Sequence, residues 1–242
     1  MILTKEERKY LLDAVAAIRD LIPETEFGYC YEDDVDLDDM AYDFITALKK
    51  VNIPAQVFAG VSKLVIVPAV GDYVIKIPFD GQYDYHYDTE DETEYKTWYP
   101  FTKAGRIFSV DDRWDYCEVE VVIYERAIDS EVEDFFVETM QIDEVLGRPI
   151  YIQKKALSIE EGGDSGKESS PEAKKNRCYC KPEHEWLEPT WIEAAIDFYG
   201  LEKVIDLKNF IDDYCLKDFH NGNVGYTSEG KPVIIDYAGW RD

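Results

Sequence analysis

The spacing of apolar residues changes from helical to extended near residue 57, and helical spacing returns at 115–128 and again from residue 189. Apolar residues recur about every 3.6 positions on a buried helix face and every second position in a strand, so these changes separate helical from extended segments. Helices therefore lie towards both ends of the chain, and strands dominate its middle. This arrangement indicates an α+β fold, with a β-rich segment over residues 53–156.

Residues 1–52 are predicted to form a helical N-terminal extension. Thr4 is positioned as the N-cap of a first helix, Glu7 completes a capping box, and Pro23 ends that helix. The apolar face of this helix holds Tyr10, Leu11, Val15, Ile18 and Leu21. The apolar face of a second helix holds Met40, Phe44, Ile45 and Leu48, with Lys49 and Lys50 at its end.

The β-rich segment begins with a hairpin signal. Two runs rich in β-branched residues, 61–67 and 73–77, flank a short turn and predict antiparallel strands. Residues 115–128 have helical spacing, whereas Phe135–Val137 and 149–153 predict a further pair of strands. Residues 80–113 carry no clear period, and we expect an inserted loop there.

Residues 157–188 predict a mobile insertion, because Ser, Glu, Gly and Lys dominate them and leave little to bury. Cys178, Cys180 and His184 within it form a candidate zinc pattern, although a fourth ligand is not evident. The five cysteines in the chain are an odd number without a regular framework, and we expect reduced thiols.

The C-terminal segment, residues 189–242, is predicted to be a small and mostly helical lobe. Helices are expected at 189–199 and 201–214, with a break at Gly200. The buried face of the second helix is predicted to hold Leu201, Val204, Ile205, Leu207 and Ile211.

Composition excludes several classes of function. The formal charge is −26, which repels the phosphate backbone and argues against direct binding of nucleic acid. No apolar run is long enough for a membrane span, and the first residues lack a secretory pattern, so we expect a cytoplasmic protein. The same charge permits an acidic surface that binds a basic protein partner.

The residues that carry chemistry lie between 216 and 239. Asp218 precedes Asn223 by five residues, and Asp236 follows Asn223 by thirteen after a short apolar run. Phosphoryl transfer uses one carboxylate to orient the attacking hydroxyl, and an Asn with a second Asp to hold Mg²⁺ against the phosphates. A plainer alternative is that Asp218 and Asn223 close a β-turn, for which Asn-Gly-Asn is well suited.

Asp218-Phe219-His220-Asn221-Gly222-Asn223 resembles the D-L-H-x-G-N catalytic loop of the protein-kinase-like superfamily, nearest to its aminoglycoside-phosphotransferase and small-molecule-kinase branch. Asp236-Tyr237 is similar to the metal-binding I-D-F position. The resemblance implies a two-lobed fold that binds ATP and Mg²⁺. It assigns orientation of the acceptor to Asp218, and metal binding to Asn223 and Asp236.

The upstream parts of that family occur in the same order. Lys76 lies in a run similar to the V-A-I-K strand, and the resemblance implies that it reaches the nucleotide phosphates. Glu120 is the preferred partner of Lys76, with Glu118 as second choice. The phosphate-covering loop would include Gly60 and Ser62, with one Gly instead of three, and the adenine-binding hinge would include Gln153, Lys154 and Lys155.

The chain also departs from the family pattern. Lys217 stands where protein kinases carry Arg and the phosphotransferases carry Gly, and Ala238 replaces the Gly two positions after the metal-binding Asp. Only six residues follow Asp236, so we expect no activation segment and a minimal C-terminal lobe. An alternative is therefore a catalytically inactive, kinase-like binding protein whose acidic surface engages a basic partner, as a phage protein could engage a host protein. Separately, a plainer alternative for Lys76 alone is an ordinary exposed strand residue.

Overall fold

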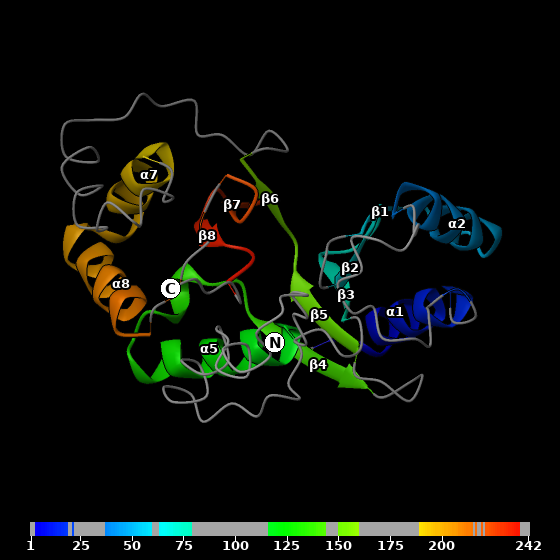
Figure 1. Cartoon of the computed structure of the whole chain (residues 1–242), viewed down its shortest axis with the longest axis horizontal. Coiled ribbons are helices and arrows are strands. Elements are labelled where there is room, and N and C mark those ends of the chain that lie inside the picture. Colours follow the sequence, from blue (N-terminus) through cyan, green and yellow to red (C-terminus); the bar gives the residue numbers. More distant parts are fainter. Residues whose placement is uncertain are drawn as a thin grey trace, which may run out of the picture. The chain divides into compact units, whose positions relative to one another are not determined.

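The computed structural model is an α+β protein (Figure 1). It describes residues 3–18, 21, 37–59, 63–78, 116–143, 150–159, 189–214, 216, 219 and 221–237. This part of the chain holds five α-helices and two antiparallel sheets. It divides into two compact units, and the chain passes from unit 1 to unit 2 after Val121, returns at Thr139 and leaves again after Lys154.

Unit 1 contains a five-stranded sheet in the order β1-β2-β3-β5-β4. Its strands are β1 (Ala55–Ala59), β2 (Lys63–Pro68), β3 (Tyr73–Pro78), β4 (Thr139–Asp143) and β5 (Ile150–Lys154). All four neighbouring pairs are antiparallel. The hairpin expected from the two β-branched runs is confirmed as β2 and β3, and β3 lies at the centre of the sheet.

Helices α1 (Lys5–Ile18) and α2 (Leu37–Lys50) cover one face of this sheet (Figure 1). The capping box of α1 is confirmed, since the Thr4 backbone amide donates to Glu7 Oε2 at 2.7 Å and the Glu7 amide donates to Thr4 Oγ1 at 3.2 Å. The prediction was wrong for Leu21, which is 38% exposed because α1 ends at Ile18.

The core of unit 1 lies between the two helices and the apolar face of the sheet. Alternation along each strand sends every second side chain to this face. Leu11, Val15, Ile18, Phe44 and Leu48 from the helices meet Val57, Leu64, Ile66, Ile75, Ile77, Ile142, Ile150 and Ile152 from the strands. Arg8 also donates from α1 to the Ile142 carbonyl oxygen at 3.1 Å, which ties the helix to the edge strand β4.

The expected helix over residues 115–128 is confirmed as α5 (Tyr116–Asp129). Its buried side chains, at positions three or four apart, form one stripe along the helix. They include Cys117, Glu120, Ile123 and Ala127. The residues named in this stripe are apolar except Glu120, whose buried carboxylate therefore needs polar partners.

The predicted strand at Phe135–Val137 was wrong. The 3₁₀ helix η2 (Glu133–Phe135) occupies its start, Phe136 makes one isolated bridge to Ile234, and the strand that pairs with β5 begins at Thr139. The apolar residues of this run pack in the core of unit 2 instead. The side chains of Phe135 and Phe136 are buried there, and the Phe135 ring centroid lies 4.3 Å from that of Tyr199.

Unit 2 contains the predicted helix pair. Helices α7 (Pro189–Tyr199) and α8 (Leu201–Tyr214) are separated at Gly200, whose φ of 88° favours glycine. Val204, Leu207, Phe210 and Ile211 are the buried residues of α8. Leu201 and Ile205 are exposed, contrary to prediction, because Leu201 begins the helix and Ile205 lies off the buried stripe. None of the described helices is long and apolar enough to cross a membrane.

Unit 2 also contains a three-stranded sheet of β6 (Ala156–Ser158), β7 (Val224–Thr227) and β8 (Pro232–Ile234). β7 and β8 form an antiparallel hairpin between Asn223 and Asp236, and the short apolar run before Asp236 forms β8. Gly225 is required where β7 meets β6, because a Cβ there would lie 2.0 Å from the Leu157 carbonyl oxygen. The buried Trp191 indole donates to the Gly225 carbonyl oxygen at 3.1 Å.

Candidate functional site

The face of the sheet opposite α1 and α2 carries polar side chains. Lys76 on β3 lies opposite Val65 on β2, and Lys63 is two residues before Val65, so both lysines project from the same face. On the other side of β3, Gln153 on β5 lies opposite Thr139 on β4 and shares this face with Lys76. The strand register therefore gathers four polar residues from four strands.

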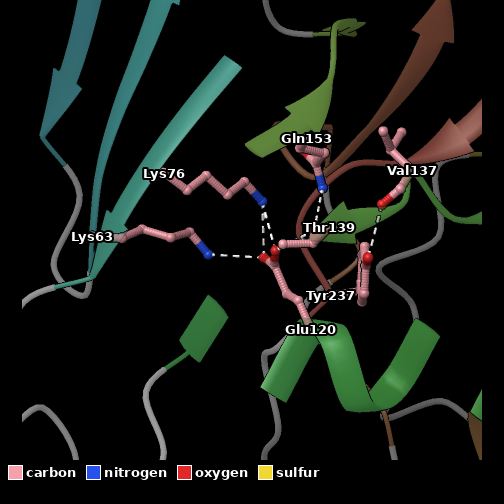
Figure 2. A network of polar contacts seen from close by, with 7 residues as sticks. All are labelled: Lys63, Lys76, Glu120, Val137, Thr139, Gln153 and Tyr237. Atoms are coloured by element: carbon pink, nitrogen blue, oxygen red, sulfur yellow. Dashed lines mark hydrogen bonds and ion pairs between the residues drawn. The ribbon is translucent and has the colours of Figure 1, made fainter. Parts of the chain in front are cut away.

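Glu120 from the first part of α5 joins these four side chains (Figure 2). Its Oε2 accepts from Lys76 Nζ at 2.8 Å, and its Oε1 accepts from Lys76 at 3.0 Å and from Lys63 at 3.1 Å. Oε2 also accepts from Thr139 Oγ1 at 2.8 Å. We call these residues, with Gln153, the Glu120 network. All five belong to unit 1.

The charges of the Glu120 network are buried. Lys63 is 5% exposed, Lys76 2% and Glu120 0%. Removing a charge from water costs several kcal/mol, which only close pairing and further hydrogen bonds offset. Lys76 is therefore not an ordinary exposed strand residue, although its neighbours Ile75 and Ile77 do point to the opposite, apolar face.

The sequence offered Glu120, with Glu118 as second choice, as the partner of Lys76. In the structure Glu120 forms the ion pair. The choice follows from helix geometry, since Glu120 is seven residues before the fully buried Ala127 and lies on the same stripe of α5. The buried stripe of α5 is thus the face that supplies the carboxylate.

Thr139 and Gln153 hold the Glu120 carboxylate from its other side. Gln153 Nε2 donates to Thr139 Oγ1 at 3.0 Å, and that hydroxyl donates onward to Glu120. A chain of hydrogen bonds of this kind fixes the orientation of a buried carboxylate. The expected hinge residue Gln153 is therefore engaged, through its side chain, within the Glu120 network.

The other expected hinge residues are more exposed. Lys154 pairs with Asp72 at 3.8 Å, and both side chains are at least 41% exposed. Such an exposed pair contributes at most about 1 kcal/mol to stability. Lys155 is half-buried, directly after β5.

The two predicted metal ligands lie together at one end of the β7–β8 hairpin in unit 2. The Asn223 carbonyl oxygen accepts from the Ile235 amide at 2.7 Å and from the Asp236 amide at 3.4 Å. The hairpin thus brings residues thirteen positions apart to one place. A carboxylate and a carboxamide fit Mg²⁺, which binds one or two carboxylates and takes its remaining ligands from phosphates and water. Within the described residues there is no cluster of three or more His, Cys, Asp or Glu side chains for a metal held by protein alone.

Aromatic residues anchor this hairpin. The buried Tyr237, next to Asp236, donates to the Val137 carbonyl oxygen at 2.8 Å (Figure 2). Tyr199 Oη lies 2.8 Å from the carbonyl oxygens of both Asp134 and Pro232 and can donate to one of them at a time. Burial, followed by the charge of Asp134, raises the pKa of Tyr199 above its ordinary value of 10.

Several predicted residues lie outside the described part of the chain. They are Gly60 and Ser62 of the phosphate-covering loop, Asp218 of the catalytic loop, and Cys178, Cys180 and His184 of the zinc pattern. The expected insertion at 80–113 and most of that at 157–188 also lie outside it.

Sequence reasoning did not place two members of the Glu120 network, Lys63 and Thr139, beside Lys76 and Glu120. A signal existed for Lys63, because strand alternation around the predicted hairpin turn places it on the same face as Lys76. Thr139 had no comparable signal, since the strand it begins was expected elsewhere.

Comparison with known proteins finds no protein family and no curated protein that matches this chain.

Proposed function

We propose that the protein is an ATP- and Mg²⁺-dependent phosphotransferase that acts on a hydroxyl acceptor. The observation that carries the proposal is the buried ion pair between Lys76 on β3 and Glu120 on α5, which among the described residues is the α-helix between β3 and β4 in the chain. In kinase-like phosphotransferases, a lysine on the third strand binds the nucleotide phosphates, and a glutamate on the following helix holds that lysine.

The proposed fold is a two-lobed kinase-like one, with residues 1–52 as a helical extension. It is supported by an antiparallel sheet whose third strand carries Lys76, and by a β-hairpin flanked by Asn223 and Asp236. Each of these parts occurs in the order that the family requires.

The proposed roles follow from the chemistry of each side chain. Lys76 neutralises phosphate charge, and Glu120 positions Lys76. Asn223 and Asp236 hold Mg²⁺, which offsets the negative charge on the transferred phosphate. The resemblance of the catalytic loop assigns Asp218 to orienting the acceptor hydroxyl. That oxygen bonds to the terminal phosphorus of ATP, ADP leaves, and the hydroxyl proton is lost to a base.

The first test is thermal unfolding with and without ATP and Mg²⁺. A ligand at about 100 times its dissociation constant stabilises the native state by about 2.7 kcal/mol. We expect a metal-dependent rise in the unfolding temperature that Asp236→Ala removes. Asp129→Ala is the matched control, because Asp129 is an exposed residue at the end of α5, with a side chain 68% exposed.

The second test separates binding from turnover. Asp218→Ala should abolish production of ADP in the presence of an acceptor while nucleotide binding persists. Absence of stabilisation at millimolar ATP and Mg²⁺ would refute the proposal. It would favour the inactive binding protein, whose salt-sensitive association with a basic partner should be unaffected by Asp218→Ala.

A further inference from the structure

The second lysine of the Glu120 network has no role in the proposed function so far. Lys63 begins β2, and its ammonium nitrogen lies 3.1 Å from Glu120 Oε1. Lys76 Nζ lies 3.0 Å from that same oxygen. Two ammonium groups from neighbouring strands therefore converge on one carboxylate oxygen.

This convergence is built into the strand register. Diagonal neighbours on one face of an antiparallel pair lie close enough for long side chains to meet. Lys63 and Lys76 occupy such positions, because Val65, which is two residues after Lys63, lies directly opposite Lys76. Both ammonium groups are buried, so their charges act in a medium that screens them less than water does.

The chemistry of this pair suits a chain of phosphates. Each ammonium carries three N–H donors, and Lys63 Nζ and Lys76 Nζ both donate to Glu120 Oε1. Lysine binds phosphate as a compact point charge, so two adjacent lysines can bind adjacent phosphate groups of one ligand. A single phosphate group offers less to such a pair than a polyphosphate does.

We propose that Lys63 is a second phosphate-binding lysine, and that Lys63 and Lys76 together bind the polyphosphate chain of the ligand. This inference rests on the proposed function where the ligand is ATP. It also implies that the two lysines share the phosphate contacts, so that loss of Lys76 alone weakens binding without abolishing it.

The test uses inorganic tripolyphosphate and orthophosphate as probes, with binding to the full chain measured by calorimetry. We expect tripolyphosphate to bind the wild-type protein more tightly than orthophosphate does. Lys63→Met should weaken tripolyphosphate binding at least about tenfold, a ratio that corresponds to about 1.4 kcal/mol. Lys63→Arg should keep the affinity within a few-fold, and Lys63→Met with Lys76→Met should weaken binding more than either alone.

The controls separate a binding role from a structural one. Lys9→Met is the matched control, because Lys9 is an exposed lysine on α1 with a side chain 75% exposed. Unfolding of each unliganded variant identifies any loss of fold, and Lys63→Gln, which keeps a donor for Glu120, replaces Lys63→Met where that variant does not fold.

Two results would overturn the inference. One is a Lys63→Met or Lys63→Gln protein that binds tripolyphosphate as tightly as the wild type does, and the other is a wild-type protein that binds no tripolyphosphate. Tripolyphosphate binding that depends on both lysines, without stabilisation by ATP and Mg²⁺, would uphold this inference and refute the proposed phosphotransferase.

Discussion

Replacing Glu120 by Gln tests what the buried charges contribute to the fold. The substitution keeps the size of the side chain but removes the negative charge that both Lys63 and Lys76 contact. Two buried ammonium groups would then meet a neutral amide. We expect a large loss of stability, because uncompensated buried charge is expensive.

The magnitude follows from the burial of all three charges. Breaking a buried ion pair by removing one partner costs about 3–5 kcal/mol. That cost is a large share of the roughly 5–15 kcal/mol by which a typical domain is stable. For a chain of this size each kcal/mol lowers the unfolding temperature by about 2–4 °C, so the fall should be about 6–20 °C.

The assay is thermal and urea unfolding at neutral pH, in low and in high salt. The loss should persist in high salt, because buried charges are poorly screened. Glu125→Gln is the matched control on the same helix. Glu125 is exposed, and its substitution should change stability by less than about 0.5 kcal/mol.

A second variant tests the reasoning itself. Replacing Lys63 and Lys76 by Met together with Glu120→Leu removes all three charges, and buried ion pairs exchanged for apolar residues often lose little stability. We expect this triple variant to be clearly more stable than Glu120→Gln. A triple variant as unstable as Glu120→Gln, or a Glu120→Gln protein as stable as the wild type, would refute the argument.

Three further predictions concern other parts of the chain. Gly225→Ala should lower the unfolding temperature of unit 2, because the new Cβ meets the Leu157 backbone oxygen; an unchanged temperature would contradict this contact. Hydrogen bonds from Thr4 lower the pKa of Glu7 below 4.5 in the folded state, so their stabilisation is present above that pH and is lost as the pH falls through the folded-state pKa. Thr4→Ala should move the pKa of Glu7, followed by NMR titration, upward; no movement would show that the hydroxyl has no part. Burial, with nearby carboxylates, raises the pKa of Tyr124 from 10 to about 12, so its contribution to stability is complete below pH 10 and is lost as the pH rises to about 12. Ionisation of Tyr124 near pH 10 in an absorbance titration would be the contrary result.

Local signals in the sequence were sufficient for most of the described elements. The capping box located the start of α1, Gly200 located the break between α7 and α8, and the β-branched runs located β2 and β3. Each of these features depends on residues near one another in the chain, where propensity and spacing act directly.

The failures lie where contacts between distant segments decide the outcome. The run Phe135–Val137 is short and apolar, and such a run suits a strand or a buried turn equally well. In the structure Phe135 packs against Tyr199, and its backbone forms a 3₁₀ turn instead of a strand. The pairing of Lys76 with Glu120 could be anticipated from the order of the elements, but the burial of Lys63 depends on α5, a distant part of the chain.

The strand order of unit 1 has a consequence for how the protein folds. β1, β2 and β3 form consecutive hairpins and can pair early, whereas β5 must return to β3 after a long stretch of chain. Such distant pairing is slow, because the entropy of closing a long loop is lost before contacts compensate for it. Until β5 arrives, β3 presents an unpaired edge, and open strand edges promote aggregation. A fragment that ends before residue 150 is therefore expected to aggregate, and one that extends through Lys154 should protect the central strand.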